Sequence, residues 1–150
     1  MITYVVLVIV LIVFLVSFLH LKKLEALAKK TPVPMPTPGI DSKVRVASMF
    51  SAGSHNNFNP KIVLSTDGFS SGAVLKNMNL YGAITEVSLN TFPLVLVGSK
   101  YWMHVGFGNY LSRISIRFMS DSNLRGVLNI FKAKGVPLSP SVEEFLAGHP

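Results

Sequence analysis

The chain has 150 residues, of which 49% are hydrophobic and only 14% carry a charged side chain. This length accommodates one domain of ordinary size together with a short additional segment. So low a charge content is unusual for a wholly soluble chain, and the hydrophobic excess is concentrated near the N-terminus. The sequence therefore argues against a multidomain protein and predicts an apolar segment joined to a more ordinary domain.

The net charge of +7 indicates attraction to polyanions, either nucleic acid or an anionic membrane surface. The basic residues of segment 40–150 are scattered singly, whereas a nucleic-acid-binding surface gathers them on one face or along one helix. The lipid bilayer is therefore the favoured partner, and nucleic acid is disfavoured. The chain has no cysteine, which excludes disulfides and thiolate metal sites.

Residues 4–19 read YVVLVIVLIVFLVSFL, and fourteen of these sixteen residues are Leu, Ile, Val or Phe. Ile2 and Leu21 lengthen the run, and about twenty helical residues span the ~30 Å hydrocarbon core of a bilayer. Fourteen such residues favour insertion by at most about 6 to 8 kcal/mol. A strand is disfavoured in lipid because its backbone groups would lack partners. The run therefore predicts a transmembrane helix over residues 1–21.

A cleaved signal peptide is the main alternative, because Ala26-Leu27-Ala28 offers a small-residue cleavage site. Against it, no Lys or Arg precedes the apolar run, which is longer than the usual signal-peptide core of about 7–15 residues. A type IV pilin stalk is a second alternative, but the run holds no acidic residue and no processing site precedes it. A retained signal-anchor is the favoured interpretation.

Four lysines flank the C-terminal end of the apolar run: Lys22, Lys23, Lys29 and Lys30. The positive-inside rule keeps such a flank in the cytoplasm. We therefore expect a single-pass membrane protein with its N-terminus outside and its C-terminal domain in the cytoplasm, or on the equivalent interior side. Each lysine near an anionic leaflet adds about 1 kcal/mol of attraction.

The helix is expected to continue through residues 22–30 as a basic amphipathic extension. Glu25 stands three residues after Lys22 and four before Lys29, a spacing that allows ion pairs. A 3-4-3-4 spacing also marks a candidate packing seam for a neighbouring helix: Phe14, Ser17, Leu21, Leu24 and Ala28. Two heptads do not establish a coiled coil, so an extension lying on the membrane surface is favoured.

Residues 31–39 read TPVPMPTPG, with prolines at alternate positions. Proline lacks the donor that a helix needs and pushes the preceding residue toward extended geometry. Eight residues of polyproline II, at ~3.1 Å each, would make a spacer of roughly 25 Å. We expect this proline-rich linker to hold the following domain away from the membrane.

From residue 40 onward apolar residues tend to recur at every second position, which is typical of strands. The stretch 51–60, rich in Gly, Asn and Ser, is expected to be a loop, and Asp67-Gly68 a turn. Seven segments are expected to form strands: 43–50, 61–65, 72–78, 83–89, 92–98, 101–107 and 113–119. Segment 40–150 is thus expected to be a β-rich domain.

An amphipathic helix is expected over residues 122–134, with Gly135 placed to end it. Its apolar stripe consists of Leu124, Val127, Leu128 and Phe131. A shorter helix is expected to begin at Ser141, in a capping box with Glu144, and to end at Gly148. Seven strands with one helix predict a β-sandwich or half-open β-barrel that the helix closes at one end. An irregular α+β sheet is the alternative.

The strands from 43–50 to 113–119, with helix 122–134, resemble the pleckstrin-homology-type (PH-like) barrel of seven strands and a capping helix. The stretch from KIVLSTDGF to LYGAITEVSL is similar to bacterial membrane-anchored proteins with a PH-like domain. This resemblance implies a β-barrel on a membrane anchor. It does not imply binding of a lipid headgroup, because loop 51–60 lacks basic residues. Trp102, the only tryptophan, also lies in an expected strand and not in the helix.

The sequence contains no recognised catalytic or cofactor motif. The four histidines are scattered: His20, His55, His104 and His149. None has a second potential metal ligand at helical spacing. Among the few acids of the domain, Asp67, Asp121 and Glu144 are accounted for by a turn, a helix start and a cap. We therefore expect no catalytic, cofactor or metal site, and a protein that is not an enzyme.

Two functions remain open. The favoured one is a membrane-tethered adaptor whose β-rich domain engages in protein–protein interaction. It would bind a partner protein or a neighbouring subunit, which can be another copy of the same chain. The other is a structural protein, a subunit of a larger membrane assembly such as a membrane-containing virion or a secretion complex. The two differ in whether the transmembrane helix packs laterally against other helices.

Overall fold

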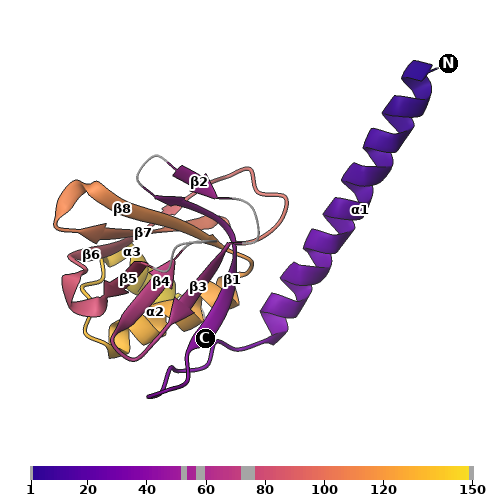
Figure 1. Cartoon of the computed structure of the whole chain (residues 1–150). Helices are drawn as coiled ribbons and strands as arrows, with labels where there is room; N and C mark the ends of the chain where they lie inside the picture. The colour runs from indigo at the N-terminus through magenta and orange to yellow at the C-terminus, as the bar shows by residue number, and fades with distance from the viewer. Residues whose placement is uncertain (1, 52–53, 57–59, 72–76, 149–150) are drawn as a thin grey trace.

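A computed structural model describes residues 2–51, 54–56, 60–71 and 77–148. The N-terminal helix α1 (Ile2–Lys30) is continuous and projects away from a β-rich domain, with its N-terminal end farthest from that domain (Figure 1). The described strands are β1 (Ser42–Ser51), β2 (Ser54–Asn56), β3 (Lys61–Leu64), β4 (Gly68–Ser71), β5 (Asn77–Leu80), β6 (Glu86–Thr91), β7 (Tyr101–Phe107) and β8 (Asn109–Phe118). The helical segments of the domain are the 3-10 turn η1 (Tyr81–Ala83), α2 (Asp121–Ala133) and α3 (Pro140–Ala147).

The strands form an antiparallel sheet in the order β5-β4-β3-β1-β8-β7-β6, with β2 paired to β1 alone. Strand β1 belongs to both halves of this sheet. Its residues Ser42–Arg45 pair with β3, and its residues Val46–Ser51 pair with β8. The register shifts between Val46 and Ser48, as at a β-bulge, and a bulge bends a strand. The sheet therefore curves around one face, as the expected layout requires, and in the described residues it stays open between β5 and β6.

The connection between α2 and α3 covers the β6 end of the sheet. The Val87 N–H donates to the Pro137 carbonyl at 2.9 Å, and the Ser139 N–H donates to the Val87 carbonyl at 2.9 Å. These bonds satisfy backbone groups that an edge strand would otherwise expose. They also place α3 beside β6, at the end of the sheet.

The core lies between the curved sheet and α2. The apolar stripe of α2 faces inward, and all four of its residues are fully buried: Leu124, Val127, Leu128 and Phe131. The Phe131 ring lies 5.5 Å from that of Phe69 and 5.6 Å from that of Tyr81, between centroids. Helix α2 begins after Ser120, whose hydroxyl accepts the Asn123 N–H at 3.2 Å, and it ends before Gly135, which has a φ of 73°.

The expected capping box at Ser141 is wrong. Helix α3 begins earlier, with Ser139 as the N-cap residue and Pro140 in the first turn, where a missing N–H has no effect. Ser141 lies inside the helix, and its hydroxyl accepts the Leu89 N–H of β6 at 3.1 Å. The expected end of the helix at Gly148 is confirmed, because Gly148 is the C-cap residue.

The expected strand at 92–98 is also wrong. The Phe92 N–H donates to the Lys100 carbonyl at 2.8 Å, and the chain between them forms an irregular loop that joins β6 to β7. We call residues 92–100 the β6–β7 loop. Pro93 cannot donate to a strand ladder, which disfavours extension of the hairpin through this segment.

Other strand boundaries differ in smaller ways. Strand β4 was missed because its sequence, GFSS, has one large apolar residue, Phe69. In the segment expected as strand 83–89, Ala83 is the last residue of η1, and strand β6 begins only at Glu86. Of the strand expected at 72–78, residues 72–76 lie outside the described residues, and β5 begins at Asn77. The expected loop 51–60 contains the short strand β2.

The proline-rich linker lies against the domain and does not separate it from α1. Val33 packs against the core, and the Ser42 hydroxyl donates to the Pro34 carbonyl. Gly126 of α2 comes so close that a Cβ built on it would lie 2.7 Å from the Cβ of Val33. The expectation of a polyproline II spacer between α1 and the domain is therefore wrong. The side chain of Val33 is partly buried on the domain, and the chain turns back at Pro38-Gly39, where Thr37 and Ile40 bond to each other.

Candidate membrane interface

The domain does not cover the apolar side chains in the N-terminal half of α1. Every side chain from Tyr4 to Ser17 is exposed. Helix α1 is long and apolar enough to cross a membrane, with a mean hydropathy of 3.0 over its most apolar part. Exposed apolar surface of this extent marks contact with lipid or with another protein.

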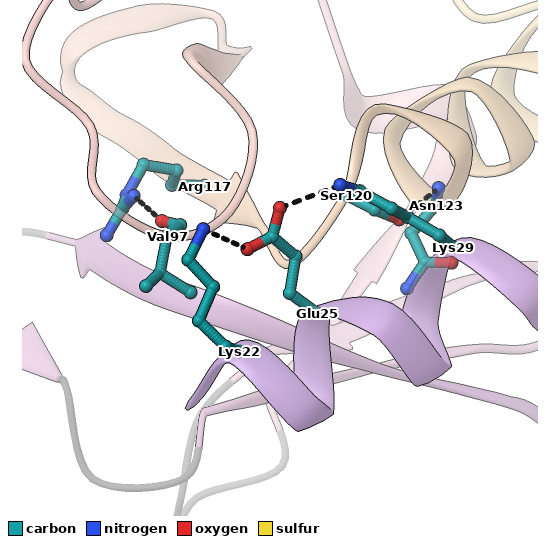
Figure 2. Close-up of polar contacts among 7 residues, drawn as sticks. All are labelled: Lys22, Glu25, Lys29, Val97, Arg117, Ser120 and Asn123. Atoms are coloured by element: carbon teal, nitrogen blue, oxygen red, sulfur yellow. Dashed lines mark hydrogen bonds and ion pairs between the residues drawn. The ribbon is translucent and has the colours of Figure 1, made fainter. Parts of the chain in front are cut away.

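The C-terminal part of α1 is different, because it carries ion pairs beside the domain. The Glu25 carboxylate lies 3.1 Å from Lys22 Nζ and 2.9 Å from Lys29 Nζ, and these three residues lie near the start of α2 (Figure 2). The Glu25 side chain is only 11% exposed. The ion pairs predicted from the spacing are therefore present, and all four flanking lysines are exposed.

The five residues of the candidate seam lie on the side of α1 that faces the domain. Phe14, Ser17 and Leu21 line a cavity together with the β6–β7 loop. The other two, Leu24 and Ala28, line a second hollow beside Met119. Use of this seam by a neighbouring helix stays a prediction, since the chain's own domain lies next to it.

The cavity between α1 and the β6–β7 loop has a volume of about 450 Å³, and we call it the α1–loop notch. One wall is formed by residues 14–21 of α1 and the other by residues 92–97 of the loop. Trp102 and Arg117 also line it, from the outer face of the sheet, where they are cross-strand partners. Apart from Ser17 and Arg117, the side chains that line the notch are apolar or aromatic.

Arg117 holds the β6–β7 loop against the sheet. Its Nη1 donates to the Val97 carbonyl at 2.7 Å (Figure 2), and its guanidinium lies 5.9 Å from the centre of the Trp102 ring. Burial lowers the pKa of Arg117, but an arginine remains charged at neutral pH. A charged donor on a carbonyl makes a stronger hydrogen bond than a neutral one.

Gly98 completes this attachment. Its φ is +91°, and a Cβ built on it would lie 2.8 Å from the Phe118 carbonyl oxygen, so only glycine fits without strain. The next residue, Ser99, donates its N–H to that same carbonyl at 2.9 Å. The loop is therefore fixed to β8 although it has no secondary structure of its own.

The outward side of the loop is apolar. Phe92, Leu94 and Leu96 are 52%, 84% and 75% exposed. Sequence reasoning missed this surface because it assigned the segment to a strand. The sequence did contain a signal against a strand. A strand with one face toward solvent alternates apolar and polar residues, whereas every side chain of PLVLV is apolar.

The histidines do not form a site in the described part of the chain. His104 Nδ1 lies 2.7 Å from the Ser115 hydroxyl, its cross-strand partner on the outer face of the sheet. Burial, and secondarily the charge of Arg113, lower the pKa of His104. His20 lines a hollow beside Arg45, while His149 and the side chain of His55 lie outside the described residues.

No group of three potential metal ligands converges within the described ranges. No model of a known protein family matches the sequence, and no curated protein shows significant similarity to it.

Proposed function

We propose that the chain is a single-pass membrane-anchored protein that acts without catalysis, and that its β-rich domain binds a protein partner or a neighbouring subunit at the membrane surface. One observation carries the proposal: α1 is apolar and exposed from Tyr4 to Val16, and it continues without a break into a segment packed on the domain. The twelve Leu, Ile, Val and Phe residues of this exposed part favour insertion by roughly 4 to 7 kcal/mol.

The domain would be held at the membrane boundary by contacts at the C-terminal end of α1. Glu25 pairs with two lysines there, and Val33 is partly buried in the domain a short distance on. The exposed Lys23 and Lys30 support a position beside anionic headgroups on the cytoplasmic side. In this arrangement the N-terminus is outside and the domain is inside.

A PH-like barrel is the finer description of the domain that we propose. Three features support it: the seven-strand antiparallel path, the sharing of β1 between two half-sheets, and the burial of α2 on the face around which the sheet curves. The preference for a binding role over a reaction rests on the sequence, which carries no recognised catalytic motif.

Membrane fractionation tests the anchor. The full chain should sediment with membranes and resist alkaline extraction, and a variant lacking residues 1–21 should be released. A matched control, Ser17→Ala, should behave as the full chain does, because Ser17 is exposed and small. Release of the full chain by alkali would contradict the proposal.

A pull-down in gentle detergent, followed by mass spectrometry, then tests the binding role. Capture of one partner by a chain that is otherwise monomeric supports the adaptor. Recovery only in constant ratio with several membrane chains supports a structural subunit, a second candidate that the exposed apolar residues of α1 also favour. A chain that is recovered alone from its native membrane would contradict both.

A further inference from the structure

The β6–β7 loop has no role in the anchor described above, yet among the described residues of the domain it carries the two most exposed large hydrophobic side chains, those of Leu94 and Leu96. Resting on the proposed membrane anchor, we propose that this loop is a second membrane contact: the side chains of Phe92, Leu94 and Leu96 enter the acyl region of the same leaflet that α1 leaves. The occupant of this surface is the lipid bilayer. The consequence is that the domain lies directly on the membrane with a fixed face toward it.

The β6–β7 loop is apolar in composition and strongly exposed. Residues 92–97 read FPLVLV, without a polar or charged side chain, and Leu94 is 84% exposed. Exposed apolar residues are common when scattered singly, but here they are adjacent to the apolar face of α1 across the α1–loop notch. The loop therefore continues the surface that the anchor presents to lipid.

The β6–β7 loop lies beside the apolar part of α1. The loop faces α1 between Phe14 and Leu21. These residues precede Lys22 in the sequence, and Phe14 stands eight residues before it. At ~1.5 Å per residue, Phe14 lies about 12 Å beyond the lysine along the helix axis. One leaflet contributes about 15 Å of hydrocarbon. If Lys22 marks the boundary, the loop lies beside a part of α1 that is within this leaflet, and Figure 1 shows the β6–β7 connection reaching toward α1.

The backbone limits how far the loop can enter. Irregular backbone exposed to hydrocarbon leaves polar groups without partners, so loops do not lie in the bilayer core. Interfacial elements insert their apolar face by about 5–10 Å and keep their polar groups among the headgroups. Pro93 has no N–H, and the Val97 carbonyl is already bonded to Arg117. Shallow insertion of the side chains therefore fits this loop, and a second span does not.

The loop is also held in place before it meets lipid. The Phe92 N–H bonds to Lys100, Arg117 bonds to Val97, and Gly98 lies against Phe118. Insertion then requires little ordering of the chain, which would otherwise oppose binding. Lys100 ends the apolar stretch and is exposed, as expected of a cation at the headgroup level.

Depth-dependent fluorescence quenching on the full chain tests the inference. Because the chain has no cysteine, single cysteines can be placed without other changes. An environment-sensitive fluorophore is attached at Leu94→Cys, at Leu11→Cys in the anchor and at Asn129→Cys on the exposed side of α2. The probe is a vesicle of phosphatidylcholine and phosphatidylglycerol that carries a nitroxide on a lipid acyl chain.

Quenching by the lipid nitroxide at Leu94 should exceed that at Asn129 several-fold. Aqueous iodide should show the reverse order. Adding Leu96→Asp should reduce the lipid quenching at Leu94 several-fold and leave that at Leu11 unchanged. Leu96 is 75% exposed, so this change does not disturb the core.

Three other results would overturn the inference. A Leu94 label open to iodide, with Leu11 quenched by lipid, removes the loop contact and leaves the anchor intact. A Leu94 label shielded from iodide but not quenched by lipid, with shielding that rises with protein density, means that a second copy covers the loop. A Leu11 label that lipid does not quench shows that the proposed anchor itself fails, and the loop inference with it.

Discussion

At the scale of single residues, two side chains on the outer face of the sheet have distinct effects: Arg117 fixes the β6–β7 loop, and His104 makes stability depend on pH. Arg117 replaces the ladder bonds that the β6–β7 loop lacks, by donating to the Val97 carbonyl. His104 is half-buried and bonded to Ser115. Neither contact could be read from spacing, because each joins residues that are more than ten positions apart in the chain.

Changing Arg117 to Gln should loosen the β6–β7 loop. The shorter amide cannot both reach Val97 and lie near Trp102, so the carbonyl loses its charged donor. Amide hydrogen exchange of residues 94–99 should accelerate by at least about tenfold, which corresponds to about 1.4 kcal/mol. Exchange in α2 should be unchanged, and uniform acceleration across the domain would contradict a local role.

His104 should make the domain less stable in mild acid. Its pKa is lowered in the folded chain from 6.5, first by burial and second by Arg113. The unfolded chain therefore binds a proton at a pH where the folded chain does not. The contribution is fully present above about pH 6.5 and declines as the pH falls toward the folded pKa.

The measurement for His104 is the unfolding midpoint of the full chain at about pH 7.5 and about pH 5.5, where a histidine titrates. The midpoint should fall more for the natural chain than for His104→Gln, because glutamine cannot take up the proton. An equal fall in both would mean that other groups carry the acid sensitivity.

At the scale of elements, α2 contacts both the core and the linker. Its apolar side, which includes Phe131, packs against the curved sheet, and Gly126 packs against the proline-rich linker. Helix α2 thus connects the core to the segment that leads to α1.

Changing Phe131 to Ala should lower the free energy of unfolding by about 3–5 kcal/mol, since the fully buried ring packs on Phe69 and Tyr81. Lys132→Ala is the control. Its ion pair with Glu143 at 2.8 Å is half exposed, so its loss should change stability by at most about 1 kcal/mol. Chemical unfolding of fragment 31–150, which keeps Val33, measures both. Equal shifts would show that α2 is not part of the core.

Gly126→Ala should have opposite signs with and without the linker. Alanine favours a helix interior over glycine by about 0.8–1 kcal/mol. In fragment 31–150, however, the new methyl would lie within 3 Å of Val33, and the linker must move. We expect destabilisation in that fragment and stabilisation by about 0.5–1 kcal/mol in fragment 40–150. The same sign in both would mean that Val33 does not rest on Gly126.

At the scale of the whole molecule, α1 and the β6–β7 loop lie on the same side of the domain. This shared side, with the lysines at the end of the apolar run, defines how the domain would meet a membrane. The linker does not provide freedom to turn, because it is packed on α2.

Orientation can be tested directly. Because the flanking lysines follow the apolar run, a reporter fused after Pro150 should be active only if it functions in the cytoplasm. Replacing Lys22 and Lys23 by Gln should reduce this preference, whereas replacing the distant Lys132 and Lys134 should not. An active periplasmic or lumenal reporter at Pro150 would contradict the orientation.

The sequence by itself determined the features that depend on local spacing and composition. These are the apolar helix with its ion pairs at Glu25, most strands of the sheet, and the buried stripe of α2. Each follows from contacts within a few residues or from a simple period. Only the tertiary structure decided where the non-periodic segments lie, because their partners are distant in the chain. The linker packs on α2 through the contact of Val33 with Gly126. The Ser141 hydroxyl accepts a hydrogen bond from β6 and does not cap a helix. The segment FPLVLV forms no strand and lies beside α1. An apolar segment predicts that something covers it, but only the fold determines what that is.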